Sequence, residues 1–229
     1  MPRVVKSPET RKGELLDCAQ ALFFARGYER TTVNDIIQQA GVSKGGFYHH
    51  FTSKEDMLEA LAARMAMQAV AQVTDVLEDP GLDALSRLNA FLARSRQMKI
   101  EDAPKIRAMF DTAFRPENIV LYHRLNAAVI GVMTPVLARI IAQGRDEGRF
   151  NTPDALMTAE IVLHLGASTH DAVARAIAAS GTAQASAAAD ALEDRLRLQG
   201  IAIDRILGLK DGSIAFVEPG FARSIMAAR

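Results

Sequence analysis

The sequence predicts an all-α protein in which a small N-terminal unit of three helices precedes a larger helical body. Apolar residues recur at three- to four-residue spacing in nearly every segment, and no run alternates as a strand does. Serine, threonine, proline and glycine stand where helices typically begin and end. The chain has 229 residues, of which 49% are hydrophobic and 24% charged, so it is long enough for a substantial core.

Composition also narrows the classes of function. The single cysteine, Cys18, excludes an internal disulfide framework and fits a reducing cytosol. The N-terminus lacks the apolar core of a signal peptide, and no segment approaches the roughly 20 uninterrupted apolar residues of a membrane span. We therefore expect a soluble, cytoplasmic protein.

Charge is distributed unevenly although the whole chain has a formal net charge of zero. Residues 1–54 hold eight Lys and Arg against five Asp and Glu, which makes this part basic and the remainder mildly acidic. The asymmetry hints at an anionic partner for the N-terminal unit.

The first predicted helix spans residues 8–26. Ser7 is its expected N-cap, Pro8 occupies the first helical position, and Gly27 ends it. Its expected buried stripe comprises Leu15, Leu16, Ala19, Leu22 and Phe23.

Two short helices follow. Thr32 and Asp35 form a capping-box-like start, and Gly41 ends that helix after about two turns. Ser43 can cap a second short helix over residues 44–51. Two short helices joined by a turn of about three residues that contains glycine form a helix-turn-helix pattern.

A much longer helix is predicted next, over residues 54–79 with Ser53 as its cap. Phe47 and Phe51 are the expected inward anchors of the short helix before it. That short helix contains adjacent histidines and adjacent glycines, and both pairs need an explanation.

Neither a metal site nor a nucleotide loop explains this segment. His49 and His50 point about 100° apart on a helix, so they do not easily share one ion, and no i, i+4 partner is present. Gly45 and Gly46 lack the spacing of a phosphate loop. Glycine costs about 1 kcal/mol in a helix interior, and close approach of the backbone to DNA in the major groove would justify it. A small solvent-facing helix without a partner is the alternative.

The stretches "ALFFARGYERTTVNDII" and "AGVSKGGFYHHFTSKEDML" closely resemble the DNA-binding segment of the TetR family of bacterial transcriptional regulators. Two positions depart from the family pattern. Ile37 stands where alanine is more usual, and Gly46 stands where Thr or Ser often faces DNA, so one DNA contact is in doubt.

The resemblance implies a homodimer with a helix-turn-helix DNA-binding domain over residues 1–53 and an effector-binding and dimerisation domain over residues 54–229. The residues expected to hold phosphates are Thr32, Lys44, Tyr48, His50 and Lys54. The residues expected nearest the bases are Asn34, Gly45, Gly46 and His49. Asn34 is the best candidate for reading a base, because an amide can pair bidentately with adenine.

The body should hold five further helices. Their expected ranges are residues 82–99, 104–114, 118–148, 154–180 and 183–207. Pro135 either kinks the third of them or divides it in two. The tail after Leu209 either packs back on the body or reaches a partner subunit.

By family analogy the last two long helices form the dimer interface. Its expected apolar contacts are Leu156, Ile161, Leu165, Ala172, Leu192, Leu196 and Ile203. The effector pocket should lie among helices of residues 84–166 and accept a hydrophobic or aromatic molecule. Its candidates are Phe91, Met98, Met109, Phe110, Phe114, Tyr122, His123, Met133, Phe150 and His164.

These features predict a ligand-responsive regulator, most simply a homodimeric repressor that a small effector releases from a palindromic operator. An activator of the same family is the nearest alternative. A helical enzyme acting on small apolar substrates and a helical adaptor are others, although neither accounts for "SKGGFYHHF". We expect no catalytic residues, no metal and no cofactor.

Overall fold

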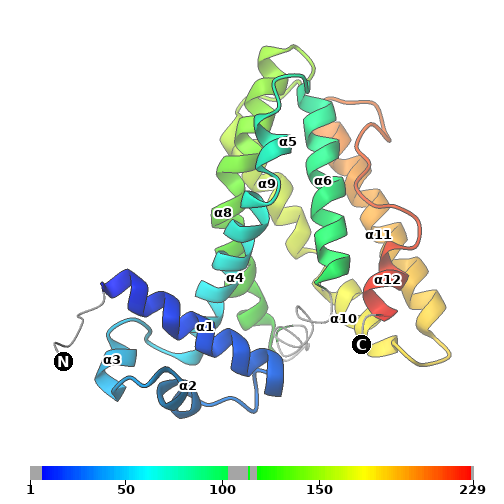
Figure 1. Cartoon of the computed structure of the whole chain (residues 1–229). Coiled ribbons are helices and arrows are strands. Elements are labelled where there is room, and N and C mark those ends of the chain that lie inside the picture. Colours follow the sequence, from blue (N-terminus) through cyan, green and yellow to red (C-terminus); the bar gives the residue numbers. More distant parts are fainter. Residues whose placement is uncertain (1–6, 103–112, 114–117, 228–229) are drawn as a thin grey trace.

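The computed structural model describes residues 7–102, 113 and 118–227, and within these ranges its regular structure is helical throughout. A small lobe made by the first three helices lies at the lower left of Figure 1, and α4 rises from it into an upright helical body. The C-terminal helix lies against the opposite side of that body, far from the N-terminus.

The N-terminal lobe contains α1 (Pro8–Arg26), α2 (Val33–Ala40) and α3 (Lys44–Tyr48), each with a side-chain N-cap. The Ser7 hydroxyl accepts from the backbone N–H of Thr10 at 3.2 Å. Thr32 and Asp35 form a reciprocal capping box. All three predicted starts are therefore confirmed.

The core of this lobe draws on more of the chain than its own three helices. The five apolar residues predicted for α1 are all buried, and so are Phe47 and Phe51. Met57 and Leu58 of α4 (Lys54–Ala71) and Leu125 of α8 (Ile119–Asp146) complete the same cluster. The expected boundary between residues 53 and 54 therefore cuts through a continuous core.

The short third helix ends earlier than the predicted range of residues 44–51. α3 stops at Tyr48, and the next two residues form a turn in which the His49 N–H donates to the Gly45 carbonyl at 2.9 Å. The chain turns here because the Phe51 side chain enters the core, where it is 1% exposed. Glycine's poor helix propensity also leaves little to prolong the helix.

Two long helices predicted as continuous are each broken. The helix expected over residues 54–79 divides into α4 and α5 (Thr74–Glu78), and Val73 at the break is 1% exposed. The break thus turns an apolar side chain into the core.

The helix expected over residues 154–180 divides into α9 (Ala155–Ala167) and α10 (His170–Ala179). At this junction the Ser168 and Thr169 hydroxyls donate to the carbonyls of Leu165 and Gly166. Such local hydrogen bonds compete with helix continuation.

The body is built around α8, which runs for 28 residues and packs on α4, on α9 and on α6 (Ala84–Glu101). It continues through Pro135 as one helix, so of the two alternatives given for Pro135 the division into two helices is excluded. By length and composition alone α8 could cross a membrane. Its packing identifies it as a central helix of the bundle instead. Of the helix expected over residues 104–114, only Ala113 lies within the described residues.

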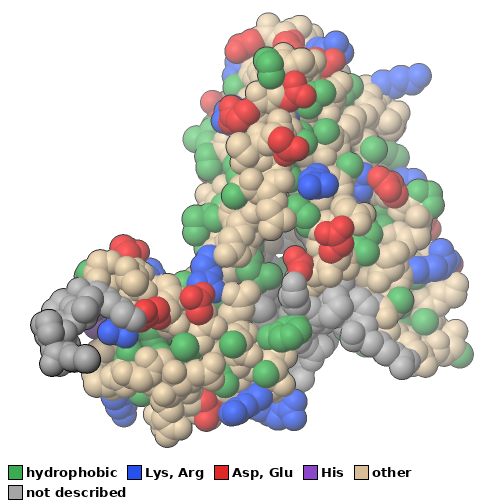
Figure 2. Space-filling view, in the orientation of Figure 1, with side chains coloured by type: hydrophobic (Ala, Val, Ile, Leu, Met, Phe, Trp, Pro, Cys, Tyr) green, Lys and Arg blue, Asp and Glu red, His purple; other side chains and the backbone are tan. Residues whose placement is uncertain are grey.

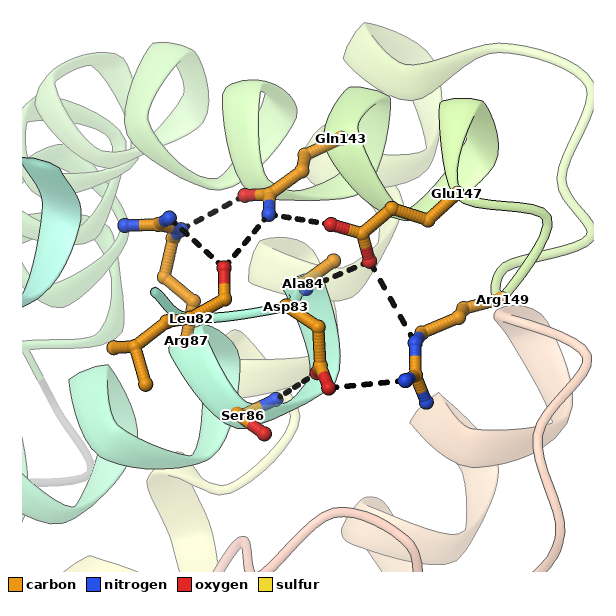
Figure 3. Close-up of polar contacts among 8 residues, drawn as sticks. All are labelled: Leu82, Asp83, Ala84, Ser86, Arg87, Gln143, Glu147 and Arg149. Atoms are coloured by element: carbon orange, nitrogen blue, oxygen red, sulfur yellow. Dashed lines mark hydrogen bonds and ion pairs between the residues drawn. The ribbon is translucent and has the colours of Figure 1, made fainter. Parts of the chain in front are cut away.

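A polar network joins the top of the body (Figure 3). The Arg87 guanidinium is 7% exposed and donates to the carbonyls of Val76, Leu77, Asp79 and Leu82 and to the Gln143 side chain. Gln143 also donates to the Leu82 carbonyl, and Glu147 accepts from the Ala84 N–H at the start of α6. The network ties the end of α5, the start of α6 and the end of α8 together.

The tail packs back on the body, which confirms one of the two alternatives. After α11 (Ala185–Ile206), the buried Asp204 carboxylate accepts from the N–H groups of Gly212 and Ile214. Arg96 of α6 donates to two tail carbonyls. Glu193 caps α12 (Phe221–Ala227) by accepting from the Gly220 and Ala222 N–H groups.

Candidate DNA interface

Lys44, Gly45, Tyr48 and His49 form the exposed side of α3, which we call the platform. The buried Phe47 side chain holds it on the core of the lobe. Phe47 is fully buried, whereas Tyr48 beside it is 49% exposed, with its ring edge-on to Phe47 at 5.2 Å between centroids. Lys44, Gly45 and His49 are exposed along the same side. Lys and Arg side chains also lie along the lower edge of this lobe (Figure 2).

Nothing inside the chain requires glycine at position 45. A Cβ atom built on Gly45 would meet only the Ser43 hydroxyl, 4.0 Å away, and its φ lies outside the left-handed region. Gly46 is tighter, because a Cβ there would lie 3.3 Å from the same hydroxyl. The helix therefore carries a weak helix former at position 45 without a packing or conformational reason of its own.

The polar groups of this platform are available to a partner. Within the described part of the chain, no hydrogen bond or ion pair holds the side chains of Lys44, Tyr48 or His49. Asn34 is exposed near the start of α2. A phosphate or base edge could engage these groups without first breaking an internal contact.

Two predicted phosphate contacts are instead engaged within the chain. The Lys54 ammonium donates to the carbonyls of Tyr28 and Thr31, at 3.1 Å each, and lies 4.0 Å from the centroid of the Tyr28 ring. The Thr32 hydroxyl and N–H both donate to the Asp35 carboxylate. A phosphate would have to compete for both side chains.

A neighbouring contact reinforces this arrangement of Lys54. The buried Tyr28 hydroxyl donates to Glu55 at 3.1 Å. Burial raises the pKa of the Tyr28 phenol, and the adjacent Glu55 carboxylate raises it further. Lys54 and Glu55 in the first turn of α4 thus hold the loop between α1 and α2 in place. The sequence alone did not predict this structural role.

The two histidines lie at the end of α3 with their ring centroids 4.9 Å apart. His49 is exposed and His50 is half-buried. Burial lowers the pKa of the His50 imidazole from its ordinary 6.5, and the nearby His49 and Lys12 lower it further. Among the described residues no cluster of three His, Cys, Asp or Glu side chains could hold a metal.

Comparison with known proteins decides the family. Residues 15–61 match the model for bacterial regulatory proteins of the tetR family, and residues 106–173 match that for the tetracyclin repressor-like C-terminal domain. Together the two matches span about half of the chain. The chain belongs to the TetR family.

Among TetR-family relatives, the HTH-type transcriptional repressor KstR2 of Mycobacterium tuberculosis is 39% identical over 95 residues, which are 42% of this chain and 47% of that protein. The uncharacterized regulator YfiR of Bacillus subtilis is 26% identical over 160 residues, covering 69% and 77%. The chain thus spans about half the length of the KstR2 relative that it matches.

Solved structures share the fold across most of the chain. RolR in complex with resorcinol aligns with a TM-score of 0.65 at 18% identity, covering 97% of this chain and 95% of that one. Thermus thermophilus FadR in complex with lauroyl-CoA aligns with a TM-score of 0.59 at 20% identity, covering 82% and 92%. The all-helical TetR architecture predicted from the sequence is confirmed.

Four of the predicted effector-binding residues of this TetR-family chain belong to one apolar core, and the other described candidates lie outside it. Phe91 and Phe150 are buried in the core of the body, and Met98 and Met133 pack against that core. His123 and His164 are exposed, so their place in an effector pocket stays a prediction; the exposed side of α9 carries His164. Met109, Phe110 and Phe114 lie outside the described residues.

Tyr122 stays a candidate for an effector pocket. It is half-buried, and burial raises the pKa of its phenol while a hydrogen bond with Thr169 opposes that shift.

A groove of about 1080 Å³ lies between α10 and α11. Alanines line most of it, together with Arg175 and Arg195. The Arg195 guanidinium donates to the backbone and side chain of Ser168. This groove lies outside the predicted effector region of residues 84–166.

The predicted dimer residues divide into three groups. Leu156 and Ile161 of α9 are 53% and 55% exposed, so they can meet a partner. Leu192 and Ile203 are buried in the chain's own cores, so little of their surface is left for a partner.

The third group, Leu165, Ala172 and Leu196, is partly buried. Met157 and Leu198, which the sequence analysis did not name, are 64% and 63% exposed. Because α9 is apolar on more than one side, helical periodicity alone does not show which of its apolar residues, such as Met157, are exposed.

Proposed function

We propose that this chain is a transcriptional repressor that binds a palindromic operator as a homodimer and leaves it when a small effector binds the body. The observation that carries the proposal is the platform on α3. It combines a glycine that the chain itself does not need with Lys44 and Tyr48 side chains that have no hydrogen-bond or ion-pair partner among the described residues. Membership in the TetR family and similarity to repressors named KstR2 support the same function.

Each platform residue then has a distinct role. Lys44 and Tyr48 hold phosphates, which position the protein on the duplex. Asn34 and His49 lie nearest the base edges, where an amide can read adenine. Gly45 lets the α3 backbone enter the major groove closely.

A second copy of the chain covers the exposed apolar side of α9 and α11. Leu156, Met157 and Ile161 present this surface on α9, and Leu198 presents it on α11. Burying such side chains supplies the main favourable term in association. The dimer then places two α3 platforms on half-sites one helical turn, or a multiple of it, apart.

The effector acts by changing which dimer conformation is populated. It binds better to a conformation whose platforms are wrongly spaced for successive major grooves, and DNA affinity falls accordingly. Leu125 gives a physical route, because α8 belongs to the body while this side chain is buried in the lobe's core. We propose a hydrophobic effector and a cytoplasmic location. We also propose that residues 1–53 form the DNA-binding domain and the rest the effector domain, which contributes Met57, Leu58 and Leu125 to the core of the lobe.

Selection from a random double-stranded DNA pool at two salt concentrations tests DNA binding. We expect recovery of a palindrome and steep salt dependence. Lys44→Ala and Tyr48→Ala should each lower operator affinity without lowering thermal stability, and Lys210→Ala, at an exposed lysine of the tail, should change neither. Recovery of no motif from the unsubstituted protein would refute the proposal. A transcription assay on the recovered site distinguishes a repressor from an activator.

Sedimentation tests the dimer. Ile161→Asp should convert the dimer to monomer, because it places a carboxylate in an apolar contact. Met67→Asp is the matched control, since Met67 is similarly exposed, at 54%, but lies on α4. Equal dimerisation by both variants would exclude the α9 surface as the interface.

A further inference from the structure

A basic group on α1 lies next to the end of α3. The Lys12 ammonium is 5.7 Å from the centroid of the Phe51 ring, and Phe51 directly follows His50 in the chain. The Phe51 ring is buried, and the Lys12 side chain beside it is half-buried. Lys12 and His50, which are 38 positions apart in the sequence, therefore lie near each other.

The charged surroundings of His50 are predominantly cationic. The groups that act on its imidazole are His49 from the end of α3 and Lys12, Arg11 and Glu9 from α1. Arg11 pairs with Glu14 at 3.0 Å. Within the described residues, the Lys12 ammonium has only its contact with the Phe51 ring, and no hydrogen bond holds the His50 side chain.

This combination suits a phosphodiester of the DNA backbone. Lysine neutralises a phosphate as a point charge, and a protonated imidazole donates to a phosphate oxygen through either ring nitrogen. We propose that Lys12 and His50 form a single phosphate site that extends the DNA interface from α3 onto α1, and that His50 takes up a proton when this site is filled. The inference rests on the proposed DNA binding, and it adds Lys12 and the proton to it.

The direction of the pH dependence follows from the charges. In the free protein, burial and the neighbouring cationic groups lower the pKa of His50, which disfavours the protonated form. A bound phosphate adds negative charge beside the ring and raises its pKa in the complex. Binding therefore takes up a proton from solvent between these two pKa values, and operator affinity rises as pH falls through that window.

Operator affinity measured between pH 6 and pH 8.5, at several salt concentrations, tests both parts. For the unsubstituted protein, affinity should rise by as much as about tenfold per pH unit for each half-site. His50→Gln should remove most of that rise, whereas the control His164→Gln, at an exposed histidine of α9, should keep it.

Lys12→Met, which keeps an apolar stem over Phe51, should reduce the slope of log affinity against log salt by about 0.9 for each phosphate that the lysine neutralises in the unsubstituted complex. Lys210→Met should leave the slope unchanged. Thermal unfolding of each variant identifies a decrease in affinity that comes from misfolding.

The outcomes separate this inference from the function beneath it. A specific operator bound with the same salt slope by Lys12→Met, or with an undiminished pH dependence by His50→Gln, would overturn the inference and leave the repressor proposal standing. A pH dependence that disappears in His49→Gln instead would also overturn it. Failure of the unsubstituted protein to bind any operator would overturn both.

Discussion

Gly144 and Gly200 in the body and Gly45 in the N-terminal lobe occupy helices for different reasons. In the body, a Cβ on Gly144 would lie 2.2 Å from the Phe150 ring, and one on Gly200 would lie 2.8 Å from the Phe216 Cβ. Packing within the chain therefore requires those glycines. A Cβ on Gly45 of α3 would meet nothing closer than 4.0 Å. Gly131 of α8 is equally unconstrained within the chain, so it is the position of Gly45 on the proposed DNA interface that ties it to a constraint from outside.

The polar side chains of the two regions differ in the same way. Arg87 in the body is buried and satisfied by five acceptors that belong to the chain. Lys44 and Tyr48 on α3 are exposed and have no internal hydrogen-bond partner among the described residues. The contrast teaches that function is better located by what the fold leaves unsatisfied than by charge alone.

The largest expected effect is on the body. Arg87→Met should lower the free energy of unfolding by about 3 kcal/mol or more, because it leaves several carbonyls without their donor. Denaturant unfolding measures it. Arg139→Met removes an exposed ion pair with Glu78 and should cost no more than about 1 kcal/mol. Similar losses for both would contradict the structural role given to Arg87.

The second prediction tests the packing reason for a body glycine. Gly144→Ala should destabilise the protein by about 1–3 kcal/mol, because the Phe150 ring must move. Gly131→Ala in the same helix is the control, since nothing lies within 4 Å of its Cβ position, and it should stabilise by about 1 kcal/mol. If both substitutions shift the denaturant midpoint in the same direction, the packing reason given for Gly144 is contradicted.

The third prediction sharpens the comparison, since it separates stability from binding. Gly45→Ala should stabilise the protein by up to about 1 kcal/mol. It should also weaken operator binding by about tenfold, the equivalent of about 1.4 kcal/mol, because the added methyl group holds the backbone away from DNA. Unfolding and binding are measured on one preparation. Unchanged affinity would mean that α3 does not approach DNA at this residue.

The smallest expected effect concerns the capping box of α2. Hydrogen bonds from the Thr32 side chain and backbone hold the pKa of Asp35 below its ordinary 3.8. A lowered carboxyl pKa contributes stability that is present above pH 3.8 and is lost as pH falls through the folded-state pKa. Denaturant unfolding from pH 6 to pH 3 should show Asp35→Asn less stable at the upper end, with a difference that narrows toward the lower end. A difference that widens in acid would contradict this sign.

The sequence predicted what depends on nearby residues. Ser7, Thr32 and Ser43 cap their helices as expected, because a cap is decided within about three positions of the chain. The inward anchors Phe47 and Phe51 followed from helical spacing in the same way.

Features decided by tertiary structure were not predicted. The break before α5 depends on the burial of Val73 among neighbouring helices. Lys54 faces a loop 23 to 26 positions away rather than solvent. His164 stands between two leucines, a setting that favours burial, yet it lies on the exposed side of α9. Periodicity defines the sides of a helix, but only packing decides which of two apolar sides is covered.

The central helix α8 also has a mechanical consequence. Leu125 lies in the core of the lobe, and Gln143 lies in the polar network at the other end of the body. Eighteen positions separate them, or about 27 Å at the helical rise per residue. A tilt of about 5° around the distal end would therefore move the lobe by about 2.4 Å. A tilt of α8 that is too small to disturb packing near Gln143 thus produces a displacement near Leu125 that is comparable to the length of a hydrogen bond.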